Sequence, residues 1–160
     1  MKKLHIVQGF KALVFILLCF FVGMNLNVPR ISDKEFGNVQ NLTLQNFDLK
    51  DYKQMSNQEI KRFLNVNPQD YERISFKRIN DPMQADEIVI VQFKLVEQGQ
   101  EFKDKMEERM ENQKNIYDGY APEEAKLVDK GIINLQANYA LYVVGDSAQE
   151  INKAFVKSLK

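Results

Sequence analysis

The stretch IVIVQFKLV, residues 88–96, decides the fold of this 160-residue chain. Its first four residues are all β-branched, and apolar and polar side chains alternate from Val91 to Leu95. β-branched residues and a two-residue alternation are typical of strands. The pattern predicts a central strand of a sheet, and Gly99 predicts its end.

The residues before this strand predict a helix, a strand and a turn. Ser56 and Glu59 have the spacing of a capping box, and the helix they open is expected to stop at Asn67-Pro68. The stretch ERISFKRI, residues 72–79, alternates like a half-buried strand. Asn80-Asp81-Pro82 is typical of a turn, so this strand is expected to lead directly into residues 88–96.

The residues after the central strand repeat the same order. A long helix is expected over 100–118, and Pro122 predicts the start of a short one. The strands expected at 132–136 and 139–145 are separated by Ala137-Asn138, which indicates a tight hairpin. A second capping-box spacing, Ser147 to Glu150, predicts a final helix.

This order, helix-strand-strand-helix twice over, indicates an α+β fold. We expect a four-stranded, mainly antiparallel sheet with the helices packed on one face. Residues 56–160 are expected to form the folded domain. Residues 25–55 show no sustained period and are interpreted as a stalk and domain edge.

The N-terminus predicts a membrane anchor over residues 1–24. Thirteen consecutive apolar residues, 12–24, follow Lys2, Lys3 and Lys11. Extended back to Leu4, the segment 4–24 is long enough to span a bilayer. Its end lacks a good cleavage site, which favours an uncleaved, single-pass anchor with the N-terminus inside and the domain outside. Secretion after cleavage is the alternative.

Composition excludes several chemistries from the folded domain. Lysine plus arginine and aspartate plus glutamate number 22 each, so no net charge favours nucleic acid. The one histidine, His5, and the one cysteine, Cys19, both precede the domain. The domain therefore has no Cys/His zinc site, Ser-His-Asp triad, thiol nucleophile or disulfide, and no cofactor is expected.

The long helix carries two polar residues where apolar ones are expected. At about 100° per residue, Arg109 and Gln113 lie at about −20° and +20° on a wheel that starts at Phe102. The surrounding apolar stripe consists of Phe102, Met106, Met110, Ile116 and Tyr117. In a structural interpretation, Arg109 and Gln113 fasten this helix to the sheet or to residues 117–122, which include Tyr117 and Tyr120. In a functional one they bind an anion together.

A buried arginine requires a charged partner. Glu87, at the start of the central strand, is the first candidate and Asp86 the second. Asp81, Asp86 and Glu87 also offer oxygens to a hard cation, but without the spacing of a known calcium loop, and no metal site is predicted.

Three short motifs resemble the bacterial "domain of unknown function 4358" family. They are ADEIVIVQFK at 85–94, RMENQKNIYDGYAPEE at 109–124 and NYALYVVGDSAQEINKAF at 138–155. Arg109, Gln113, Tyr120, Pro122, Asn138 and Tyr139 match the family pattern. Gln136-Ala137 departs from its usual lysine-glycine, so the hairpin turn is expected to differ. The resemblance implies an extracytoplasmic location and supplies no activity.

Together these patterns predict a non-enzymatic, membrane-anchored binding or accessory domain for an envelope protein or small ligand. One alternative is a carboxylate-dependent hydrolase of envelope polymers, which needs two acids facing one cleft. The other is a structural subunit of a membrane assembly, which predicts a broad exposed apolar patch.

Overall fold

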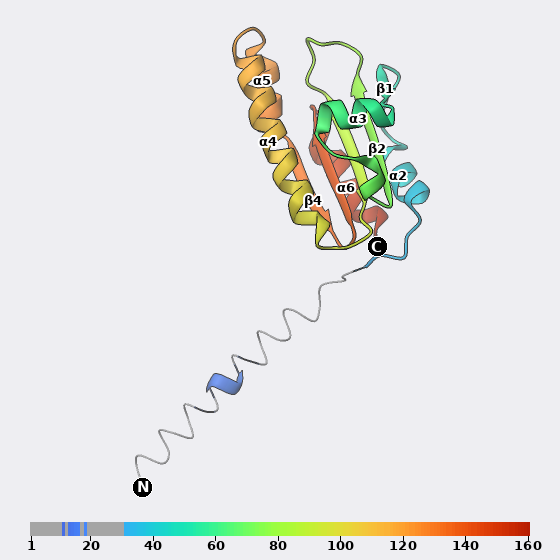
Figure 1. Ribbon diagram of the computed structural model, residues 1–160, viewed down its shortest axis with the longest axis vertical. Coiled ribbons are helices and arrows are strands. Elements are labelled where there is room, and N and C mark those ends of the chain that lie inside the picture. The colour runs from blue at the N-terminus through green and yellow to red at the C-terminus, as the bar shows by residue number, and fades with distance from the viewer. Residues whose placement is uncertain (1–10, 12, 17, 19–30) are drawn as a thin grey trace. The chain divides into compact units, whose positions relative to one another are not determined.

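The computed structural model describes residues 11, 13–16, 18 and 31–160, and residues 31–160 form one folded unit (Figure 1). Most of the predicted anchor, residues 4–24, lies outside the described residues. Within the part of the chain that the structure describes, no helix has the length and apolar character needed to cross a membrane.

The core of the unit is an antiparallel sheet of five strands in the order β1-β2-β3-β5-β4. The predicted α+β class with an antiparallel sheet is confirmed, and the predicted number of four strands is wrong. The additional strand, β1, has three residues and lies at an edge, where its pairing with β2 places Tyr52 opposite Ile79. So short a strand has no recognisable alternation of its own. The strands are β1 (Tyr52–Gln54), β2 (Arg73–Ile79), β3 (Glu87–Gln92), β4 (Ile132–Gln136) and β5 (Tyr139–Val144).

Five α-helices and one 3₁₀ turn connect and cover these strands. The predicted repeat of helix-strand-strand-helix is confirmed as α3-β2-β3-α4 followed by α5-β4-β5-α6. The helical elements of the folded unit are α2 (Phe36–Leu44), α3 (Asn57–Leu64), η1 (Pro68–Asp70), α4 (Gln98–Asp118), α5 (Pro122–Asp129) and α6 (Ala148–Ser158).

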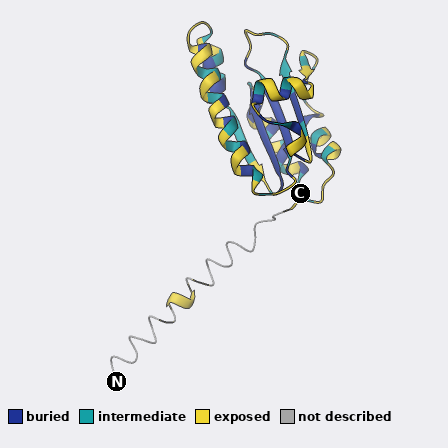
Figure 2. Ribbon diagram, in the orientation of Figure 1, coloured by how far each residue is buried: buried dark blue, intermediate teal, exposed yellow. Residues whose placement is uncertain are grey.

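Helices cover both faces of the sheet, so the prediction of helices on one face is wrong. Val89 and Val91 of β3 point to a core shared with α3, α4 and α5, whereas Ile88 and Ile90 point to a second core shared with α2 and α6. The central strands β3 and β5 are accordingly dark blue in Figure 2, whereas the helices are yellow on their outer sides. The physical reason is that every residue of β5 is buried, which leaves no face of the central strands for water.

Residues 31–55, expected to be part of a stalk and domain edge, contribute α2 and β1 to the fold. Helix α2 packs against α6, and Val39 on its inner side is fully buried. This helix is only weakly amphipathic by sequence, which explains why no period was recognised. Its burial depends on a partner more than 100 residues later in the chain.

The predicted end of the central strand and one predicted helix cap also differ from the structure. The central strand stops at Gln92 rather than Val96, because its partner β5 begins at Tyr139, opposite Gln92, and pairing ends with that hairpin. Gly99 does not terminate a strand but lies inside α4. The Ser56–Glu59 capping box is formed, but Ser147 makes no side-chain cap to α6.

Candidate functional site

The centre of the site is a buried ion pair between the middle of α4 and the start of β3. Arg109 donates from Nε to Glu87 Oε1 at 2.7 Å and from Nη2 to Glu87 Oε2 at 2.6 Å. This two-pronged geometry is the strongest form of an arginine-carboxylate contact. The predicted partner of Arg109 is therefore confirmed as Glu87, and Asp86 instead accepts a hydrogen bond from Tyr52.

Two further groups complete this pair. The Tyr142 hydroxyl, from β5, donates to Glu87 Oε1 at 2.7 Å, and Arg109 Nη1 donates to the backbone carbonyl of Phe63 at the end of α3. The pair therefore joins one helix to a second helix and to two strands. Neither the Phe63 carbonyl nor the Tyr142 hydroxyl was identified from the sequence, because each residue fits the pattern of apolar residues in its own helix or strand.

Burial makes the charges of this joint interdependent. The Arg109 and Glu87 side chains are only 8% and 4% exposed. Burial alone would lower the pKa of Arg109, but the charge and hydrogen bonds of Glu87 raise it above its ordinary value. Burial, with the Glu87 charge, also raises the pKa of the Tyr142 hydroxyl well above its usual range, which keeps this group a hydrogen-bond donor.

Gln113, one turn after Arg109, does not join the pair. No hydrogen bond of its side chain to another described residue is present, and it lines a surface hollow of about 190 Å³ with Arg109. Ile116, which was expected in the buried stripe of α4, is 57% exposed at the rim of this hollow. It lies at the edge of the predicted stripe.

Tyr117 and Tyr120 hold the loop between β2 and β3. The Tyr117 hydroxyl donates to the Gln84 carbonyl at 2.8 Å, and Tyr120 reaches the Pro82 carbonyl at 3.4 Å. Burial, followed by the neighbouring Tyr120, raises the pKa of Tyr117 to about 12. These contacts agree with the interpretation of residues 117–122 as part of a structural joint.

Asn138 and Tyr139 lie away from this joint and retain the first residues of the folded unit. Asn138 Oδ1 accepts from the Ser32 amide at 2.7 Å, and the Tyr139 hydroxyl donates to the Lys34 carbonyl at 2.7 Å. The ring of Tyr139 stacks on Phe36. The predicted site residues thus form two groups, one around Arg109 and one that fixes residues 32–36 to the β4–β5 hairpin.

The turn of this hairpin carries an unusual backbone angle. Ala137 has φ of +55°, in the left-handed region that favours glycine. The tight turn at Ala137-Asn138 is confirmed, since Gln136 pairs directly with Tyr139. Alanine therefore adopts a left-handed conformation at the position where the family pattern has glycine, which costs backbone strain.

The acidic residues near the start of β3 do not form a metal site. The carboxylate of Glu87 binds Arg109, that of Asp86 accepts a hydrogen bond from the Tyr52 hydroxyl, and that of Asp81 accepts one from the Met83 amide. Across the described residues, no cluster of three or more His, Cys, Asp and Glu side chains is arranged to hold a metal ion.

The chain also matches a known family. The profile described as a domain of unknown function (DUF4358) matches residues 45–145, more than half of the 160 residues. The chain belongs to the DUF4358 family. No curated protein and no solved structure matches it. The DUF4358 match spans all five strands together with the Arg109–Glu87–Tyr142 joint, and it ends before α6.

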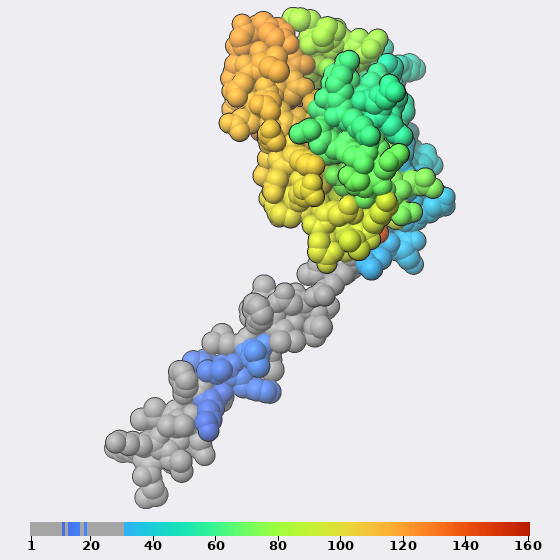
Figure 3. Space-filling view, viewed as in Figure 1, coloured from blue at the N-terminus to red at the C-terminus, as the bar shows by residue number. Residues whose placement is uncertain are grey.

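A second hollow lies on the other side of Phe63 from the Gln113 hollow. It has a volume of about 220 Å³ and is lined by residues from β1, α3 and β2. Phe63 borders both hollows, and its carbonyl is the group held by Arg109. Helices α3 and α4 contact each other, and the green and yellow segments of the chain adjoin on the surface in Figure 3. The DUF4358 joint therefore shapes the surface on both sides of Phe63.

Proposed function

We propose that this DUF4358 protein is a membrane-anchored, extracytoplasmic binding or accessory module without an activity of its own. Its ligand or partner in the envelope contacts the face around Phe63. The anchor is the apolar segment 4–24, preceded by lysines. The family match supports membership of DUF4358, and the binding role rests on the following features of the site.

The observation that carries the proposal is the contrast between a joint whose charges are paired within the protein and its neighbouring hollows. Arg109 uses its donors on Glu87 and the Phe63 carbonyl, so it is engaged by the protein itself. Next to it, two hollows of about 220 and 190 Å³ are bordered by polar and charged side chains. Binding sites are typically concave, with a few fixed polar groups held by a rigid scaffold.

The hydrolase alternative has one specific observation in its favour, because Glu59 and Asp81 border the same hollow. However, the Ser56 amide, with Lys53 and the Ser56 hydroxyl, lowers the pKa of Glu59 to about 2. A carboxyl group with so low a pKa has no proton to donate near neutral pH, and a glycosidase needs a general acid. The arrangement favours binding over hydrolysis.

Cysteine labelling tests the location. In a Cys19→Ser background, Ser147→Cys places one thiol on an exposed residue of the folded unit, and Lys2→Cys places one ahead of the anchor. A membrane-impermeant maleimide is expected to label Ser147→Cys in intact cells, and Lys2→Cys only after permeabilisation. Labelling of Lys2→Cys alone in intact cells would refute the proposed orientation.

Site-specific photo-crosslinking tests the binding face. A photoreactive amino acid at Ile116, which is 57% exposed beside the Gln113 hollow, is compared with one at Leu42, which is 46% exposed on α2. The proposal predicts a discrete adduct from Ile116 and none from Leu42. Equal adducts from both positions, or none from Ile116, would contradict a binding face around Phe63.

A further inference from the structure

The 220 Å³ hollow contains an unusual arrangement of cations. Lys53 of β1, Arg62 of α3 and Arg78 of β2 border it together. The guanidinium carbons of Arg62 and Arg78 lie 4.4 and 5.0 Å from the centroid of the same ring, that of Phe63. Stacking on an aromatic ring restricts a guanidinium group while leaving its N–H donors available at the edge.

Neither arginine is neutralised by the protein. Within residues 31–160, neither Arg62 nor Arg78 forms an ion pair, and neither donates a hydrogen bond. Glu87 lies directly opposite Arg78 in the β2–β3 register, but its carboxylate binds Arg109 and Tyr142 instead. Two like charges on one ring repel each other, and a bound anion relieves this repulsion.

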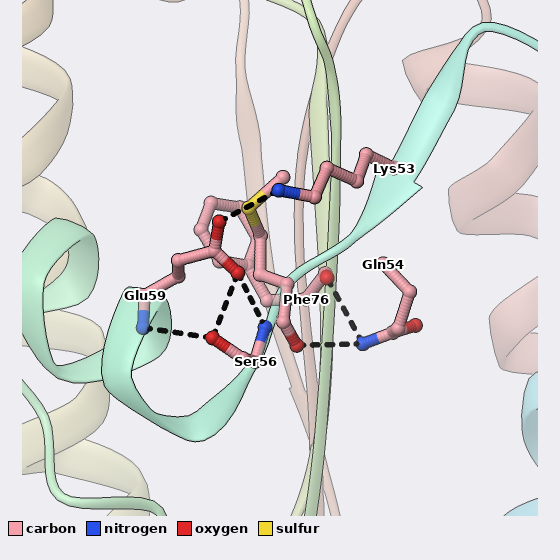
Figure 4. A network of polar contacts seen from close by, with 6 residues as sticks. Lys53, Gln54, Ser56, Glu59 and Phe76 are labelled. Atoms are coloured by element: carbon pink, nitrogen blue, oxygen red, sulfur yellow. Dashed lines mark hydrogen bonds and ion pairs between the residues drawn. The ribbon is translucent and has the colours of Figure 1, made fainter.

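The carboxylates of the hollow are already occupied. Glu59 accepts from the Ser56 amide and hydroxyl, each at 2.8 Å, and from Lys53 Nζ at 2.9 Å, as Figure 4 shows. Asp81 Oδ1 accepts from the Met83 amide at 2.8 Å. Lys53 and Glu59 therefore cancel, whereas Asp81, whose partner is a neutral amide, still offsets one of the two arginine charges. Three cations against two carboxylates leave the hollow a net charge of +1, carried by the unpaired guanidinium groups.

We propose that this hollow binds a phosphate group, with Arg62 and Arg78 as its two ligands. This inference rests on the proposed binding function and names the ligand class of the Phe63 face. Paired guanidinium groups present planar donors that match the oxygens of phosphate. The volume of about 220 Å³ exceeds one phosphate, and apolar Met55, Ile79 and Pro82 also border it. The hollow therefore suits a phosphomonoester with a small organic portion. Arg109 is a positioning residue here, because it holds the Phe63 carbonyl.

The test is calorimetric titration of the full chain in nonionic detergent and Tris buffer. Inorganic phosphate and glycerol 1-phosphate are the free probes, and vesicles of phosphatidylcholine with or without phosphatidic acid present the same group on a lipid. Saturable one-to-one binding of a free probe identifies a soluble phosphate ligand. Binding to the phosphatidic acid vesicles alone identifies a lipid headgroup.

Matched variants assign any binding to the hollow. Arg62→Gln and Arg78→Gln are each expected to weaken phosphate binding by about tenfold or more. Arg73→Gln, on the same strand as Arg78 but outside the hollow, is expected to leave it unchanged. Arg78→Lys keeps the charge and loses the planar fork, so an intermediate affinity is expected. This variant also provides a measurement if Arg78→Gln does not fold.

Three outcomes would overturn the phosphate site. They are no saturable binding of any probe at millimolar concentration, equal weakening by Arg73→Gln, or full affinity in both Arg62→Gln and Arg78→Gln. Preference for malonate over phosphate would assign the hollow to carboxylates and overturn it as well. None of these results alters the Ile116 and Leu42 crosslinks, so failure of the phosphate site is distinguishable from failure of the proposed function.

Discussion

Replacing Arg109 by methionine is expected to destabilise the folded unit by about 3 to 5 kcal/mol at pH 7. Methionine fills most of the volume of the arginine stem, so little packing is lost. The cost comes from Glu87, whose side chain is only 4% exposed and retains only the Tyr142 hydroxyl as a partner. The Phe63 carbonyl also loses its donor, which adds about 1 kcal/mol.

The unpaired carboxylate accounts for most of this cost, because a buried charge without an opposite partner loses its solvation and gains nothing in return. A second substitution that removes the charge of Glu87 is therefore expected to recover most of the lost stability.

The assay is urea unfolding of the full chain in nonionic detergent, followed by near-ultraviolet circular dichroism. The chain has no tryptophan, and its six tyrosines all lie between residues 52 and 142, so the signal reports on the folded domain. Adding Glu87→Gln to Arg109→Met removes the charge and keeps an acceptor for Tyr142, which should recover most of the lost stability. Lys103→Met, which breaks an exposed pair with Glu107 in the same helix, is the control and should change stability by less than about 0.5 kcal/mol.

A decrease of less than about 1 kcal/mol in the free energy of unfolding of Arg109→Met at pH 7 would refute this reasoning, because removing one partner of a buried ion pair destabilises by several kcal/mol. A loss of the expected size that Glu87→Gln does not recover would also refute it. In that case the unpaired carboxylate would not be the source of the cost.

Four further substitutions test the backbone and the edge of the sheet, each by the same unfolding assay. Ala137→Gly is expected to stabilise the chain by about 0.5 to 1 kcal/mol, because glycine adopts the φ of +55° without strain, and an unchanged or lower midpoint would contradict this. Gly145→Ala is expected to destabilise the fold by about 2 to 4 kcal/mol, because φ at this position is +138° and the new Cβ would lie 2.4 Å from Asp86 Oδ1. The control is Gly37→Ala in the first turn of α2, where the added Cβ has open space, and it should be neutral or stabilising. Burial raises the pKa of the Asp86 carboxyl above its ordinary value of 3.8. The folded state therefore holds this proton more tightly than the unfolded state, and the contribution of Asp86 to stability falls as the pH rises above about 4. Asp86→Asn should accordingly gain stability relative to wild type as the pH is raised from 4 to 7.

The order of the elements from α3 to α6 was predictable because each is signalled by residues close together in the sequence. Examples are the β-branched run of β3, the capping box at Ser56 and the proline at the start of α5. The Arg109–Glu87 pair was predictable for a related reason. A charge on an apolar helix face violates a local rule, and burial then requires an opposite charge on an adjoining element.

Other features depend on residues distant in sequence. Strand β1 exists only through its register with β2, and α2 is buried only by α6. Asn138 was notable by its family match, but its partner, the Ser32 amide, is an ordinary backbone group 106 positions away. No pattern in either segment records such a contact.

The sequence by itself thus determined the order of helices and strands from α3 to α6, the hairpin at residues 137–138 and the charged joint of α4. The tertiary structure alone decided that both faces of the sheet are covered and that the joint ends on a carbonyl of Phe63. It also placed Arg62 and Arg78 on one ring. The physical reason is that periodicity and capping are short-range and written in neighbouring residues, whereas strand register and helix packing bring together groups whose distance in space is independent of their separation along the chain.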